Sequence, residues 1–197
     1  MAETPSNSNE DETTNRIYVI VGTCHPIQWR PKDLTPPERE LIDGLDSLIR
    51  ALVSKYKIRL IAEETLGPNS PPTVAHQIAK DEKIRYLEID MLPHEAEKAG
   101  ILEEMGRRYD PSSGENPNAE VRLCRADDTR ENFWLDKIEG TKVTPVLVVC
   151  GWAHSGFLAK KVRARHCVVT EDIYFPPCLR EGKIERVAAV RPIARGC

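Results

Sequence analysis

Two histidines follow glycines that end apolar segments, and both stand at the same spacing. Gly22 ends one such segment and is followed by His25, while Gly151 ends another and is followed by His154. The β-branched and aliphatic residues of both segments predict buried strands. Each histidine therefore enters the turn after a strand, and each glycine allows a sharp exit of the backbone or a close approach to a ligand.

Acidic side chains end the other predicted strands. These residues are Glu63 and Glu64, Asp90, and the pair Glu171 and Asp172. Imidazole and carboxylate groups are ligands that a divalent transition metal takes together. In a parallel sheet the carboxyl ends of the strands meet at one edge, where ligands bind. The sequence therefore predicts a metal or catalytic site at this edge.

The elements that must position these side chains alternate between strand and helix. Short apolar runs predict strands over residues 17–22, 58–64, 84–90, 145–151 and 166–175, with an edge strand over 183–193. Amphipathic stretches with capping residues predict helices over residues 35–57, 73–82, 94–109, 127–140 and 154–165. This alternation is typical of a three-layer α/β domain, with a mostly parallel sheet of about five strands and helices on both faces.

With these motifs, the chain resembles the TraB/Tiki/ChaN and erythromycin-esterase superfamily. Its members carry two Gly-x-x-His motifs, a glutamate that ends the second strand, and an arginine followed by an acidic or amide residue before the second motif. Here Arg130 and Glu131 match the last feature, and the order agrees over residues 16–165. Family members are usually longer, with helical insertions over the site, so the resemblance implies that this chain keeps the core.

The residues and the resemblance together predict a metal-dependent hydrolase of ester or peptide bonds. His25, Glu63 and His154 are expected to hold a divalent Zn, Mn or Co ion, which would lower the pKa of a bound water. Adjacent strand residues face opposite ways, so one glutamate is expected to point at His25. Glu63 is preferred over Glu64, and the glutamate that is not a ligand would take the proton of the water. Arg130 is expected to stabilise the anionic intermediate or to clamp a substrate carboxylate.

Three alternatives stay open. In a metal-free site, His25 or His154 would be the general base for water, and this arrangement resembles the esterase branch of the superfamily. A haem- or metal-binding module without turnover would resemble ChaN. A degenerate relative would serve as a protein-interaction domain. Under the hydrolase hypothesis, the partner is a small-molecule or peptide substrate.

Composition argues against several other classes of protein. The chain has 28 basic and 31 acidic residues, and the basic ones are scattered among acids, so no nucleic-acid partner is expected. No apolar run approaches the roughly 20 residues that span a bilayer, so no membrane partner is expected either. Residues 1–15 are expected to form a disordered polar tail before a single domain over 16–197. The cysteines show no CxxC spacing and the polar N-terminus does not resemble an export signal, so we expect reduced thiols in a cytoplasmic protein.

Overall fold

The computed structural model describes residues 16–23, 28, 36–65, 72–108, 117–164 and 166–173. For residues 37, 38, 106–108, 117–124 and 167–173 it describes the backbone alone. The predicted tail over 1–15 and the predicted edge strand over 183–193 lie outside the described residues. Among the described residues, no helix is long and apolar enough to cross a membrane.

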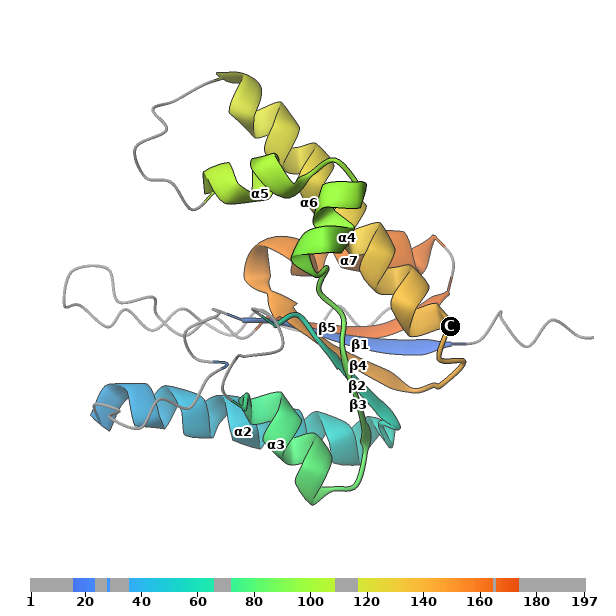
Figure 1. Cartoon of the computed structure of the whole chain (residues 1–197). Helices are drawn as coiled ribbons and strands as arrows, with labels where there is room; N and C mark the ends of the chain where they lie inside the picture. The colour runs from blue at the N-terminus through green and yellow to red at the C-terminus, as the bar shows by residue number, and fades with distance from the viewer. Residues whose placement is uncertain are drawn as a thin grey trace, which may run out of the picture.

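A parallel sheet of five strands forms the middle layer (Figure 1). The strands are β1 (Ile17–Thr23), β2 (Leu60–Glu63), β3 (Arg85–Glu88), β4 (Val146–Gly151) and β5 (Cys167–Ile173). Their order across the sheet is β3-β2-β4-β1-β5, and every pairing is parallel. The prediction of an α/β domain with a mostly parallel sheet of about five strands is confirmed.

Helices cover both faces of the sheet, as predicted. The helices are α2 (Pro36–Tyr56), α3 (Val74–Asp81), α4 (Pro93–Lys98), α5 (Leu102–Arg108), α6 (Pro117–Glu139) and α7 (Trp152–Arg163). Helices α2 and α3 lie on one face, and α6 and α7 lie on the other (Figure 1). Apolar side chains of β1, β2 and β4 alternate between the two cores that result, for example Val19 and Val21 in one and Tyr18 and Ile20 in the other.

The direction of the connections explains which face each helix covers. The chain moves from β1 to β2 and β3 on one side of the sheet, returns to place β4 between β2 and β1, and ends in β5 at the other edge. Crossovers between parallel strands have the same hand, so a reversal of direction moves the connecting helices to the opposite face. The connections after β2 and β4 therefore leave the sheet on opposite faces, and in open α/β sheets ligands bind at the carboxyl edge beside such a pair of strands.

Three helix boundaries differ from those predicted. The helix expected over 94–109 is two short helices, because Gly100 between them adopts a positive φ of 69°, which ends α4. The helix expected from residue 127 already begins at Pro117, and the one expected from residue 154 begins at Trp152, directly after β4. As a result, His154 is the third residue of α7 rather than its first, and it lies within the first turn.

Candidate functional site

Glu64, which comes directly after β2, belongs to a buried polar cluster at the carboxyl edge of the sheet. Its Oε1 accepts a hydrogen bond of 2.6 Å from Arg130 Nη2. Its Oε2 accepts one of 2.7 Å from the backbone N–H of Gly151, at the end of β4. One carboxylate thus joins the ends of two neighbouring strands to helix α6.

Arg130 lies at the centre of this cluster and is 4% exposed. Its Nε and Nη2 donate hydrogen bonds to Asp90 Oδ1 at 3.2 and 3.0 Å, and Nη2 also donates to Asp90 Oδ2. The guanidinium lies over the ring of Trp134, whose Nε1 donates to Asp90 as well. Although burial lowers the pKa of Arg130, the charges of Glu64 and Asp90 raise it above its usual range. Burial raises the pKa of Asp90, and Arg130 opposes that change.

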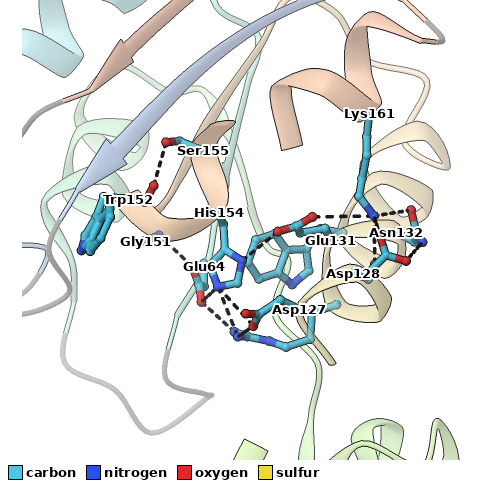
Figure 2. Close-up of polar contacts among 12 residues, drawn as sticks. Glu64, Asp127, Asp128, Glu131, Asn132, Gly151, Trp152, His154, Ser155 and Lys161 are labelled. Carbon is cyan, nitrogen blue, oxygen red and sulfur yellow. Dashed lines mark hydrogen bonds and ion pairs between the residues drawn. The ribbon is translucent and has the colours of Figure 1, made fainter. Parts of the chain in front are cut away.

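His154 faces this arginine from the first turn of α7 and is 2% exposed. Figure 2 shows its ring between Glu64 and Glu131. Its Nδ1 lies 3.0 Å from Oε1 of the buried Glu131. Its Nε2 lies 3.4 Å from Arg130 Nη1, and 3.8 Å from both Glu64 Oε1 and Asp127 Oδ1. Of these neighbours Asp127 has the most exposed side chain, at 27%, so it marks the solvent side of the imidazole.

The glycines of the two histidine motifs have different roles: Gly22 allows close packing, and Gly151 donates a backbone hydrogen bond. A Cβ on Gly22 would lie 2.7 Å from the Oγ and 2.9 Å from the Cβ of Ser155, so only glycine lets β1 approach the start of α7 this closely. Gly151 has a φ of −57° and precedes α7 as its N-cap. Its N–H binds Glu64, and it therefore acts through a hydrogen bond rather than through an unusual conformation.

Glu63 points to the other face of the sheet, away from His154. Its Oε2 accepts hydrogen bonds from the hydroxyls of Thr73 and Tyr86, the latter at 2.7 Å. Burial raises the pKa of Glu63 to about 7, although both hydrogen bonds lower it. The alternation of the strand places Glu64, and not Glu63, on the side of α6 and α7 beside His154. The preference for Glu63 as the residue that points at His25 stays a prediction. His25, the other predicted partner, lies outside the described residues.

The described residues do not fit a divalent metal ion. The oxygens of Glu64 and Asp90 already accept hydrogen bonds from Arg130, Gly151 and Trp134, and the guanidinium supplies the positive charge that a metal would bring. Within the described part of the chain, no group of three His, Cys, Asp or Glu side chains could hold a metal. Two of the three predicted metal ligands, Glu63 and His154, lie on opposite faces of the sheet and therefore do not come together.

Two members of the cluster were not predicted to act. Glu131 enters the prediction only as the residue after Arg130, and Asp127 only as part of the cap that begins the predicted helix over 127–140. The spacing of acidic and basic residues on the predicted helix could have found them, since Asp127, Arg130 and Glu131 stand three and four residues apart and share one helical face.

Comparisons with known proteins identify no relative. No family model, no curated protein and no solved structure matches the chain. The resemblance to the TraB/Tiki/ChaN and erythromycin-esterase superfamily therefore stays a prediction, as does the haem binding that it implies. Function has to be argued from the geometry of the site.

Proposed function

We propose that the protein is a hydrolase that cleaves an ester or peptide bond by attack of water, with His154 as the general base. One observation carries the proposal: a buried imidazole at the carboxyl edge of a parallel sheet has its Nδ1 3.0 Å from the carboxylate of Glu131. A carboxylate at one ring nitrogen fixes the tautomer of a histidine and leaves the other nitrogen free to accept a proton. In this protein the second nitrogen, Nε2, faces Arg130 and Asp127.

The reaction needs no group beyond these side chains and water. Nε2 of His154 takes a proton from the water, whose oxygen forms a bond to the carbonyl carbon of the substrate while the carbonyl electrons move to oxygen. Three carboxylates stabilise the imidazolium against the charge of Arg130, whose Nη1 lies 3.4 Å from Nε2. They are Glu131 at Nδ1, and Glu64 and Asp127, each 3.8 Å from Nε2. As the carbonyl re-forms, the bond to the leaving group breaks. The Nε2 proton passes to that leaving group, which gives an acid and an alcohol or amine.

Arg130 is the donor that the negative tetrahedral intermediate requires. Its Nε and Nη2 are held by Glu64 and Asp90 at 2.6–3.2 Å. By contrast, the contacts of Nη1 are longer, with a hydrogen bond of 3.4 Å to His154 Nε2 and an ion pair of 3.8 Å to Asp127 Oδ1. Nη1 lies beside Nε2, so its N–H groups can donate to an oxyanion there while Nε and Nη2 keep the bonds that fix the guanidinium. Donors held in place before the reaction are the most effective at stabilising such a charge.

A second histidine–glutamate pair provides a comparison within the same chain. Nε2 of His166 lies 3.0 Å from Glu139 Oε1, and the ring of His166 stacks on Tyr18. This pair lies at the opposite edge of the sheet, where β5 begins and α6 ends. Arg16 Nη1 donates a hydrogen bond of 2.9 Å to the backbone carbonyl of the same Glu139. This end of the sheet holds the amino ends of the strands, whereas ligands of parallel sheets bind at the carboxyl edge. His166 is therefore the matched control for His154.

The test is a hydrolysis assay on the purified full chain, with short-chain p-nitrophenyl esters and blocked peptides as substrates. We expect turnover by the wild type, a loss of roughly 100- to 10,000-fold in His154→Gln, as for the loss of a general base, and a smaller loss in Glu131→Gln. His166→Gln should keep its activity. No turnover of any substrate by the wild type, or equal activity of His154→Gln and His166→Gln, would refute the proposal.

A further inference from the structure

Lys161 stands seven residues after His154 on α7, which is close to two turns, so both side chains project from the same face of the helix. That face is turned toward α6, the helix that carries Glu131. Figure 2 shows Lys161 reaching across to α6 beside Glu131, Asp128 and Asn132. Lys161 thus contacts Glu131, the glutamate beside His154, and not His154 itself.

The ammonium group of Lys161 is fully engaged with α6. It donates hydrogen bonds to the backbone carbonyl of Asp128 at 3.1 Å, to Asn132 Oδ1 at 3.0 Å, and to the Asp128 carboxylate. An ammonium has three N–H donors, so these acceptors use all of them. Because three contacts to a neighbouring helix fix its position, the charge of Lys161 is held at a defined place, with the side chain only 19% exposed.

Glu131 lies between this charge and the histidine. Its Oε2 is 3.6 Å from Lys161 Nζ, and its Oε1 is 3.0 Å from His154 Nδ1. The side chain of Glu131 is 3% exposed, and a buried carboxylate without a nearby positive charge is strongly disfavoured. Of the lysines and arginines in the described part of the chain, Lys161 lies within ion-pair distance of Glu131. Lys161 is therefore the cation that faces the buried carboxylate of Glu131 from α7.

Two contacts decide where the proton of His154 lies, with Glu131 at Nδ1 and Arg130 Nη1, which can only donate, at Nε2. A carboxylate can only accept, so His154 must carry its proton on Nδ1, which leaves Nε2 as the base. A neutral Glu131 could instead donate its own proton to Nδ1, and His154 would then carry its proton on Nε2 and could not take one from water. We propose that Lys161 is a positioning residue that keeps Glu131 ionised and thereby holds His154 in its basic tautomer. The catalytic part of this inference rests on the proposed hydrolase function.

The experiment compares Lys161→Met, Lys161→Arg and the wild type, with Lys160→Met as the matched control. Lys160 lies on the same helix, is exposed, and packs on the ring of Phe157 rather than on α6. Long-range ¹H–¹⁵N correlation spectra of the full chain report the tautomer of His154, and His154→Gln identifies its signals. Turnover and KM are measured on the best ester of the panel, and melting temperatures report the fold.

We expect the wild type, Lys161→Arg and Lys160→Met to show neutral His154 protonated on Nδ1. Lys161→Met should show the Nε2-protonated form, with kcat about 10- to 100-fold lower, as for the loss of groups that orient a functional histidine, and KM within about twofold. If Lys161→Met does not fold, Lys161→Gln keeps an amide donor for Asp128 without the charge, and the same outcome is expected.

A variant that melts at a lower temperature but keeps the wild-type tautomer and kcat would show that Lys161 only joins the helices, and would overturn the inference. An Nε2-protonated wild type would overturn it as well. If no substrate is hydrolysed, the proposed function fails. The tautomers of the wild type and the lysine variants then still decide whether Lys161 controls His154.

Discussion

Replacing Glu63 with glutamine should remove a large pH dependence from the stability of the protein. Glu63 is fully buried at the end of β2, and its Oε2 accepts hydrogen bonds from Thr73 and Tyr86. Its Oε1 has no partner among the described residues. Glutamine can place its carbonyl oxygen at Oε2, keep both hydrogen bonds, and put the amide where the protonated Oε1 would be. The variant therefore mimics the neutral acid at every pH.

The magnitude follows from the pKa of this carboxyl. Burial raises the pKa of Glu63 from 4.5 to about 7 in the folded protein. The folded state therefore holds the proton more tightly than the unfolded state, and this contribution to stability is complete below pH 4.5 and lost as the pH rises through 7. With about 1.4 kcal/mol for each pKa unit of difference, the free energy of unfolding should fall by about 3 kcal/mol between pH 4.5 and pH 8.

The assay is urea unfolding followed by circular dichroism at pH values from 4.5 to 8. The difference in free energy of unfolding between Glu63→Gln and the wild type should move by about 3 kcal/mol in favour of the variant over this range. Glu88→Gln is the matched control, because Glu88 is exposed and pairs with Glu63 in register on β3. Parallel pH profiles of Glu63→Gln and the wild type, or a variant less stable at pH 8, would refute the reasoning.

Other consequences of the structure can be tested on the same preparations. Gly22→Ala should lower the free energy of unfolding by about 1–3 kcal/mol, because its Cβ would lie 2.7 Å from Ser155 Oγ; an unchanged urea midpoint would contradict this. Arg130→Met leaves Glu64 and Asp90 without their buried partner, and should lower the free energy of unfolding in urea by about 3–5 kcal/mol. A decrease below about 1 kcal/mol would argue against a buried network. Dialysis against EDTA should leave the melting temperature and any hydrolysis unchanged, since the carboxylates already bind Arg130; a drop reversed by added Zn²⁺ would reveal a metal site. The thiol of Cys150 is free and buried, and burial raises its pKa, so Ellman's reagent should label it only after unfolding; rapid labelling of the native protein would show exposure.

The sequence by itself determined the succession of strands and helices and the edge of the sheet where chemistry is placed. The run Val146–Gly151 is apolar at nearly every position because it is buried on both faces, and such a run is visible without any contact. His154 follows from the same reasoning, because it comes just after a strand that ends at the carboxyl edge. Arg130 was indicated only by the resemblance to the superfamily. Helix ends were less predictable, because α6 extends to Pro117 through residues whose local pattern is typical of a loop.

Only the tertiary structure decided which side chains meet at that edge. Neighbouring residues of a strand face opposite ways, so the choice between Glu63 and Glu64 depends on which helices cover each face. That in turn depends on β4 returning between β2 and β1, a pairing of distant segments that no local pattern encodes. The contact of Lys161 with α6 has the same origin: residues 161 and 131 belong to different helices, and their distance is set by how α6 and α7 pack on the sheet.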